Sequence, residues 1–191
     1  TAAFTLKAVD LGKPIPIIYG NVARHALLYV NDDTVLNQYD YLVGRGALTV
    51  DALYRDGPNN TLHLIDPSEY TVETTRYTGL TTVRFPLRQV NFSNAFHTIF
   101  ADVTGLAAER HFARAGRTLL SDSTYGLGQA INAASFDAAE AQVDPVTGTA
   151  VTGLYCDGVL SAPRPAGDIL RELLMVRGMR LSLNAAGEWT I

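Results

Sequence analysis

The sequence has 191 residues, of which 47% are apolar and 18% are charged, which is typical of a chain that folds around a core and not of a disordered one. The formal net charge of -4 disfavours specific binding of duplex nucleic acid, because such binders normally carry a basic surface. Since Cys156 is the only cysteine, no disulfide can form within the chain and no cluster of thiolates can hold a metal.

Up to Gly105 the sequence predicts short strands joined by turns, because runs rich in β-branched and aromatic residues alternate with clusters of turn formers. The clearest of these strands are 15–19, 26–30, 39–43, 50–54 and 61–65. Residues 55–60, between the last two strands, predict the turn of a hairpin. Apolar and polar residues also alternate at 70–72, 81–85 and 99–103. This period of two is typical of antiparallel sheets with one buried face.

The second half of the chain begins with residues 106–117, which we interpret as a basic, alanine-rich connector. A stretch rich in turn formers and glycine follows it. Ser135 is a favourable N-cap residue and predicts a helix near 135–143. Pro145 ends this helix, because the residue before a proline avoids helical geometry.

The last third of the sequence predicts a strand, a helix and a hairpin that form one α+β unit. The strand covers residues 153–160. Pro165 suits the first turn of a helix near 165–177, in which leucine and isoleucine side chains recur on one face. Gly178 is the expected C-terminal glycine of that helix, and apolar residues then alternate along 179–191 as in a hairpin.

These patterns predict a β-rich α+β fold with two domains. An antiparallel β-rich domain, either a barrel or a sandwich, is expected over 1–105, and a smaller strand–helix–hairpin domain over 106–191. The longest apolar stretches have the length of a strand and are too short to cross a membrane. We therefore expect no membrane span.

The sequence predicts no catalytic, metal-binding or cofactor-binding residues. It contains no phosphate-cradling P-loop, and Gly126-Leu127-Gly128 lacks the third glycine of a dinucleotide turn. The histidines stand far apart, without the spacing of metal ligands. Cys156 adjoins Asp157, and a neighbouring carboxylate raises the pKa of a thiol, so a small buried apolar role is favoured over a nucleophile. We expect a protein that is not an enzyme and needs no cofactor.

One local basic patch is predicted, formed by Arg110, Arg114 and Arg117 with His111 beside them. At helical spacing the three arginines would share a face. Two interpretations of this patch remain open at this point. It is either a solvated helix face or a contact between subunits, since arginine is enriched in protein interfaces. The acidity of the whole chain makes a role in DNA binding the weakest of the options.

Three segments, taken in order, carry a resemblance to a known family. The first is 12–21, with the sequence GKPIPIIYGN. The second is 99–105 (IFADVTG), followed by 124–128 (TYGLG) and the helix near 135–143. The third runs from 156–160 (CDGVL) through 169–174 (ILRELL) to 187–191 (GEWTI). This pattern resembles the hub proteins of phage tails, which occur in siphophage tips, myophage baseplates, prophages and gene transfer agents.

The resemblance implies a structural protein of the virion tail, assembled in the bacterial host cytoplasm. It implies a tail-tube-like β-domain and a homotrimer that joins the tail tube protein or distal tail protein to the distal tip. The tape measure protein and a tail fibre or receptor-binding protein are further implied partners. The family offers no active-site residues to carry over. Hub proteins are longer, and this chain begins at Thr1 and ends at Ile191 directly after a strand-like run, so we expect one portion of a hub.

Two other classes of function compete with this interpretation. A carbohydrate-binding or adhesion module would expose several aromatic side chains on one surface. Tyr29, Tyr41 and Tyr54 lie in alternating runs, however, and are expected to fill the sheets. A cell-wall hydrolase-associated tail domain would need paired carboxylates or a metal site.

Overall fold

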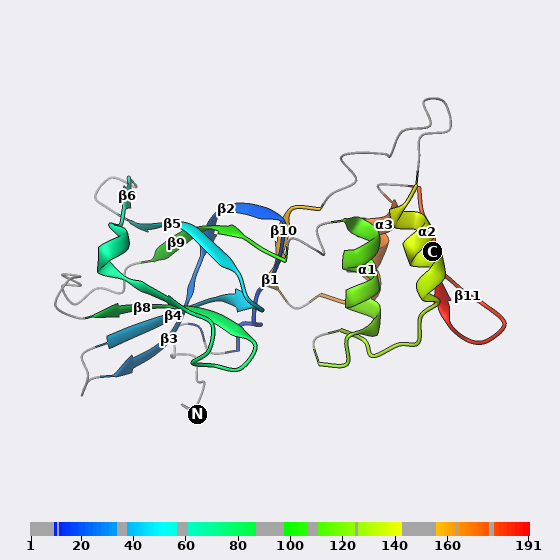
Figure 1. The fold of residues 1–191 in the computed structure, drawn as a ribbon, viewed down its shortest axis with the longest axis horizontal. Helices are drawn as coiled ribbons and strands as arrows, with labels where there is room; N and C mark the ends of the chain where they lie inside the picture. Colours follow the sequence, from blue (N-terminus) through cyan, green and yellow to red (C-terminus); the bar gives the residue numbers. More distant parts are fainter. Residues whose placement is uncertain are drawn as a thin grey trace. The chain divides into compact units, whose positions relative to one another are not determined.

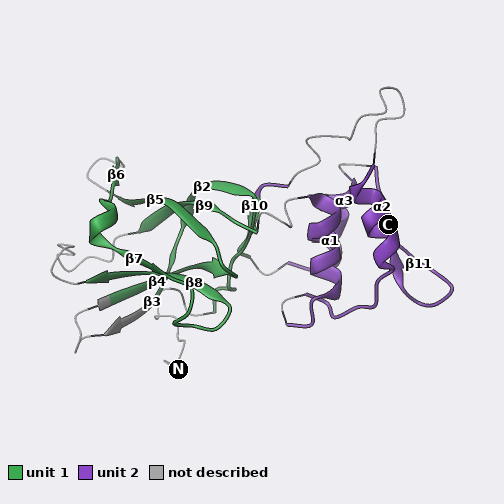
Figure 2. Ribbon diagram, in the orientation of Figure 1, with its two compact units in different colours: residues 1–106, 158–163 green, residues 107–157, 164–191 purple. Residues whose placement is uncertain are grey.

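The computed structural model describes residues 10, 12–33, 38–56, 61–86, 98–106, 111–124, 126–142, 156–162, 164–175 and 178–191. The fold is a β-rich α+β fold, as the sequence predicts (Figure 1). The chain divides into two compact units (Figure 2). The first consists of Thr1–Leu106 with Gly158–Pro163, and the second consists of Ala107–Asp157 with Arg164–Ile191.

The first unit contains two four-stranded sheets, with strand orders β2-β9-β5-β6 and β3-β4-β8-β7, and every pairing in them is antiparallel. Their strands are β2 (Asn21–Ala26), β3 (Leu28–Asp33), β4 (Gln38–Arg45), β5 (Thr49–Asp56), β6 (Leu62–Leu64), β7 (Thr71–Glu73), β8 (Leu80–Pro86) and β9 (Ile99–Thr104). A short 3-10 turn, η2 (Pro67–Glu69), connects β6 to β7. The predicted hairpin is confirmed by the antiparallel pairing of β5 with β6; its turn residues 57–60 lie outside the described residues.

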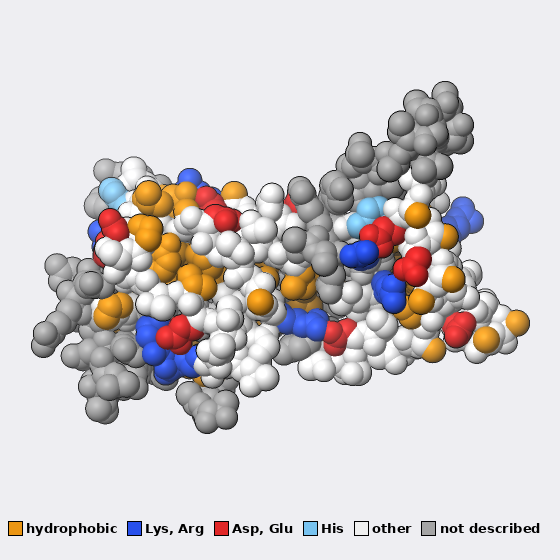
Figure 3. Space-filling view, in the orientation of Figure 1, with side chains coloured by type: hydrophobic (Ala, Val, Ile, Leu, Met, Phe, Trp, Pro, Cys, Tyr) orange, Lys and Arg blue, Asp and Glu red, His pale blue; other side chains and the backbone are white. Residues whose placement is uncertain are grey.

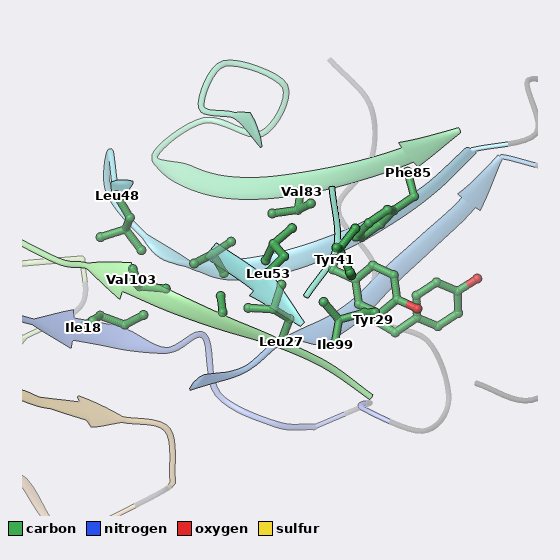
Figure 4. Packing of buried hydrophobic residues seen from close by; sticks show 13 residues of the cluster. Ile18, Leu27, Tyr29, Tyr41, Leu48, Leu53, Val83, Phe85, Ile99 and Val103 are labelled. Atoms are coloured by element: carbon green, nitrogen blue, oxygen red, sulfur yellow. The ribbon is translucent and has the colours of Figure 1, made fainter. Parts of the chain in front are cut away.

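The two sheets pack face to face around one core (Figure 4). Tyr41 and Phe85 come from one sheet and Leu53 and Ile99 from the other, and their side chains point toward one another. The rings of Tyr41 and Phe85 meet edge to face with centroids 5.7 Å apart, a favourable aromatic geometry. Among the described residues the sheets do not close into a barrel. The first unit is thus a sandwich, which was one of the two predicted alternatives.

A third, two-stranded sheet joins distant parts of the sequence in the first unit. Strand β1 (Ile17–Tyr19) pairs antiparallel with β10 (Gly158–Leu160), and Ile17 faces Leu160. The sequence interpretation placed the strand 153–160 with the C-terminal helix and hairpin. Its described part pairs instead with β1, a partner that local patterns cannot reveal because the two strands are so far apart in the chain.

Strand β2 was not predicted, because Gly20 and Asn21 were interpreted as a turn. The strand is also irregular at Arg24, which has a positive φ of 58°. The pairing of β2 with β9 shifts register between Val22 and His25, which marks a bulge. The bulge interrupts the alternation of apolar and polar residues from which strands are recognised.

A buried charge network covers the outer face of the sheet β3-β4-β8-β7. Asp40 on β4 is only 2% exposed. Its Oδ1 accepts a hydrogen bond of 2.9 Å from Nε of Arg84, and its Oδ2 lies 3.1 Å from Nε of Arg76. Tyr77 donates its hydroxyl to the same Oδ2 at 3.4 Å, and Nη1 of Arg84 lies 3.3 Å from Oε1 of Glu73. Desolvation by burial raises the pKa of Glu73.

The second unit consists of three described helices and a C-terminal hairpin. Its elements are α1 (Phe112–Ser121), α2 (Ala133–Glu140), α3 (Ala166–Met175), β11 (Ser182–Leu183) and β12 (Trp189–Thr190). Leu120 of α1, Phe136 of α2 and Leu170 of α3 are buried together, with Trp189 packed against them. The predicted hairpin is confirmed by the antiparallel pairing of Leu183 with Trp189.

The helices of the second unit differ from the sequence interpretation in two places. Most of the described part of the connector 106–117 belongs to helix α1, which begins after His111, an unusual N-cap whose Nδ1 accepts the Ala113 N–H at 3.3 Å. A glycine within this helix, Gly116, also weakens the helical signal. Helix α2 begins two residues before the predicted start at Ser135, because Asn132 is the N-cap and accepts the Ser135 N–H at 3.2 Å.

The histidine of β2 makes the stability of the first unit depend on pH. His25 is buried, and its Nε2 lies 2.9 Å from the carbonyl oxygen of Val43 on β4. Because a carbonyl oxygen can only accept, Nε2 carries the proton of the neutral ring. Burial lowers the pKa of His25, and the hydrogen bond to Val43 offsets part of this decrease.

We expect His25 to destabilise the first unit as the pH falls. In the unfolded chain His25 binds a proton at about pH 6.5, whereas in the folded chain it binds the proton only at lower pH. The contribution of neutral His25 to the free energy of unfolding is therefore fully present above about pH 6.5 and is lost as the pH falls below that value. Urea unfolding at a series of pH values, followed by circular dichroism, measures the effect. A His25→Gln variant should lose less stability on acidification than the wild type, and equal losses in the two proteins would contradict the assignment.

Candidate interaction surfaces

The arginines predicted to form a surface patch are engaged within the second unit. Nε of Arg114 pairs with the carboxylate of Glu140 at 2.6 Å, and Nη1 of Arg117 pairs with that of Asp137 at 3.0 Å. Both pairs join α1 to α2, and Figure 3 shows cations and carboxylates side by side over these helices. Arg110 lies outside the described residues. A contact of these arginines with another subunit stays a prediction.

Charge-swap variants separate the two roles of Arg114. Arg114→Gln should lower the free energy of unfolding of the second unit by less than about 1 kcal/mol, because the pair is half exposed and is screened by solvent. The swapped protein Arg114→Glu/Glu140→Arg restores the internal pair but reverses the charge shown to any neighbour. If the oligomeric state changes on the single substitution and stays changed in the swap, Arg114 contacts another subunit. Recovery in the swap would limit its role to the helix pair.

The outer face of the sheet β2-β9-β5-β6 carries a second surface, which we call the β9 face and define by Ala26, Tyr54, Leu64, Phe100 and Asp102. In register, Phe100 lies between Ala26 of β2 and Tyr54 of β5, and Tyr54 is opposite Leu64 of β6. Leu64 is 65% exposed. Figure 3 shows hydrophobic side chains gathered over β5 and β9. The face therefore presents an apolar row across all the strands of one sheet.

The β9 face is held by the strained residue of the β2 bulge. The backbone N–H of Arg24 donates to Oδ1 of Asp102 at 2.9 Å, and its guanidinium lies 3.8 Å from the centre of the Tyr54 ring. The Tyr54 hydroxyl donates to Oδ2 of Asp102 at 2.9 Å, and this hydrogen bond is the main cause of the raised pKa of Tyr54. Non-glycine residues with positive φ persist where their surroundings hold them. These contacts hold the Arg24 guanidinium and the Tyr54 ring together as a cationic and aromatic pair.

The tyrosines expected to fill the sheets separate into two groups. Tyr29 and Tyr41 are buried in the core of the sandwich, as predicted. Tyr54 is half buried on the outer side of its sheet, so the prediction is wrong for this residue. The register shift between Val50 and Ala52 on β5 hides this change of side from a simple alternation.

The second unit contains an apolar groove, which sequence reasoning missed. Its volume is about 420 Å³, which lies within the usual range for binding pockets. It is lined by Leu120, Leu127, Gly167, Leu170, Arg171, Leu174, Met175, Met179, Arg180, Leu181 and Trp189. The groove thus combines helices α1 and α3 with the C-terminal hairpin, and no carboxylate is among these lining residues.

Local hydrogen bonds position two of the lining residues, Met179 and Trp189. Gly178 has a positive φ of 69°; its N–H donates to the Met175 carbonyl at 3.0 Å, and the Met179 N–H donates to that of Leu174 at 3.1 Å. This pair of bonds is a Schellman motif, which reverses the chain after a helix and brings Met179 back onto α3. At the hairpin, the Trp189 N–H donates to the Ala130 carbonyl at 2.9 Å.

Side chains capable of catalysis or metal binding are dispersed in the structure. No group of three or more histidine, cysteine, aspartate or glutamate side chains that could hold a metal occurs among the described residues. His25 is bonded to the backbone, His63 lies on the exposed strand β6, and His111 caps α1. Cys156 is half buried.

None of the helices in the described ranges is long and apolar enough to cross a membrane.

Comparison with known proteins found no relative of this chain. No model of a known protein family matches it, no curated protein does, and no solved structure does.

Proposed function

We propose that this protein is a structural component of a phage, prophage or gene transfer agent tail tip, where it acts as a hub that joins the tail tube or distal tail protein to the distal tip. The observation that carries the proposal is that one part of each resembling segment lies at or beside a single strand, β1. Segment 12–21 contains β1, segment 99–105 contains β9, and segment 156–160 contains β10. These three parts meet at or beside β1, whereas 124–128, 169–174 and 187–191 belong to the second unit.

The contacts at β1 depend on the residue types that the resemblance rests on. The Gly105 N–H donates to the Gly20 carbonyl at 2.7 Å, and the Leu106 N–H donates to the Ile18 carbonyl at 3.0 Å. A Cβ atom at Gly105 would lie 2.4 Å from the Ile18 carbonyl oxygen, so only glycine fits this position. Ile18 is fully buried in the core, and Val159 of β10 packs against the same core.

The first unit also has the surfaces that a subunit of an assembly needs. Besides the β9 face, strands β6 and β7 are edges of their sheets and carry the exposed apolar side chains of Leu62, Leu64 and Val72. Exposed edges with apolar side chains favour pairing with another chain. On this proposal the protein is a homotrimer in the virion tail. It binds the distal tail or tail tube protein, the tape measure protein, and a tail fibre or receptor-binding protein, and it uses no cofactor.

Assembly assays test the tail-tip proposal directly. The purified protein should form a trimer or ring in light scattering, alone or after mixing with the tail tube or distal tail protein. Leu64→Glu should weaken that assembly by placing a charge on the β9 face, whereas Arg164→Gln, at an exposed residue of the second unit outside both the β9 face and the groove, serves as a control. A wild-type protein that remains a monomer and binds neither tail protein would contradict the proposal.

The β9 face also favours a second candidate, a carbohydrate-binding or adhesion module. Tyr54 and Phe100 stand opposite each other on one exposed surface, and Asp102 and Arg24 lie beside them as hydrogen-bonding groups. Aromatic rings flanked by polar groups suit the stacking of a sugar ring. A glycan array distinguishes the candidates, because binding that is lost in Tyr54→Ala would support the adhesion module.

A further inference from the structure

The groove of the second unit is lined mainly by apolar side chains and is open to solvent. Leu170 and Leu174 form its buried floor, with exposures of 4% and 2%. Met175 at 65% and Leu127 at 44% are exposed at its border. Leu183 lies opposite Trp189 in the hairpin, so both side chains are on the same side of the two strands and the apolar surface continues past the groove. A surface of this kind accommodates a row of large apolar side chains.

Two cations at the groove have no charged partner among the described residues of the second unit. Arg114, Arg117 and Arg164 each pair with a carboxylate. The side chains of Arg171 and Arg180, which line the groove, have no ion pair or hydrogen bond with any residue in the described ranges. Because these two cations come from different elements, one on α3 and one before β11, they suit a ligand with at least two anionic groups.

The chain's two methionines both line this groove. Met175 ends α3 and Met179 follows the glycine turn. Methionine has a flexible, polarizable side chain that adapts to differently shaped partners, and it is used heavily at surfaces that bind apolar helices. Their position at this border favours recognition of a protein segment over a rigid small molecule.

From these features we infer that the groove binds an acidic amphipathic helix of a partner protein. Large apolar side chains of that helix enter the groove, and carboxylates beside its apolar face pair with Arg171 and Arg180. A fatty acid fits less well, since it offers one carboxylate to two separated guanidinium groups. The inference rests on contacts within the second unit alone and is independent of the tail-tip proposal.

Trp189 makes the inference directly measurable. It is the only tryptophan of the chain and it lines the groove, so its emission reports occupancy of this site. The probe is a synthetic peptide of about 15 residues, long enough to form a helix, with leucine and phenylalanine on one face and glutamate beside them. The intact protein is titrated with the labelled peptide, and both peptide anisotropy and Trp189 emission are followed.

Variants of the groove separate its charges from its apolar wall. Arg171→Glu/Arg180→Glu should weaken peptide binding at least about tenfold, because two attractions become repulsions. Arg164→Gln, which removes an arginine outside the groove, should leave binding unchanged. Met175→Ser should weaken binding about threefold while leaving the fold intact, because this side chain is exposed.

Control ligands test whether the groove prefers an acidic peptide. A peptide with lysine in place of glutamate should bind at least about tenfold more weakly than the acidic one. Equal binding of the two peptides, no change in Trp189 emission, or full affinity in the Arg171→Glu/Arg180→Glu variant would overturn the inference. Binding of dodecanoate in preference to the acidic peptide would overturn it in favour of a fatty-acid site. Tail assembly is not used as a readout, so these outcomes stay separate from those of the assembly assays.

Discussion

Replacing Asp40 with alanine is expected to lower the free energy of unfolding of the first unit by about 3 kcal/mol or more, the range for breaking a buried ion pair from one side. Asp40 is 2% exposed, while Arg84 and Arg76, whose Nε atoms lie 2.9 Å and 3.1 Å from it, are only 16% and 19% exposed. Without the carboxylate of Asp40, two guanidinium groups remain largely dehydrated, and Glu73 is the carboxylate that remains in the described network. Urea unfolding followed by far-UV circular dichroism measures the loss.

A double-mutant cycle tests whether this loss comes from the charge pair. Asp40→Ala/Arg84→Ala should cost less than the sum of the two single substitutions by at least about 1 kcal/mol, since the second change removes a charge that the first one left unpaired. Glu73→Gln, at the more exposed border of the network, should cost no more than about 1 kcal/mol. Strict additivity of the Asp40 and Arg84 substitutions would mean that the network does not couple them.

Gly105→Ala is the second substitution for which we expect a large effect. The added Cβ would lie 2.4 Å from the carbonyl oxygen and 2.8 Å from the carbonyl carbon of Ile18, so backbone atoms on one side must move. That movement strains the hydrogen bonds from Gly105 to Gly20 and from Leu106 to Ile18. We expect a loss of about 3 kcal/mol, at the upper end of the range for overpacked cores.

A second glycine of the same unit provides the control for Gly105→Ala. A Cβ atom at Gly158 on β10 would meet no atom within 4 Å, so Gly158→Ala should change the free energy of unfolding by less than about 0.5 kcal/mol. The two variants introduce the same methyl group into neighbouring parts of one junction. Equal stabilities of the two proteins would show that the backbone at Ile18 yields without strain.

The elements that could be predicted from sequence are those whose own residues carry the signal. Strand β9 alternates between buried and half-buried positions, and β4 contains a run of β-branched and aromatic residues, so both signals depend on local side chains alone. Strand β2 was missed because its bulge at Arg24 is held by Asp102, far away in the chain. Helix α1 was missed because it begins after an unusual N-cap, His111, and contains a glycine, Gly116, and both weaken the local helical signal.

The candidate surfaces were harder to predict than the elements, because each combines residues from several segments. The sequence pattern placed Arg114 and Arg117 on one helix face, but the carboxylates they pair with come from the following helix. The groove joins α1, α3 and the hairpin, and its nearest sequence signal was the pair of methionines four residues apart. Neither partner choice nor groove formation can be read from a single amphipathic segment.

The pairing of β1 with β10 bears on how the protein is made. A ribosome releases Ile17–Tyr19 long before Gly158–Leu160, and the helices α1 and α2 emerge between them. During translation, β1 therefore has no β10 to pair with until late. Closing the long loop between the two strands is then a late and entropically costly step. Cutting the chain after Leu106 would remove β10 from the first unit for the same reason. A shorter version of that unit needs residues 158–163 rejoined to it by a linker.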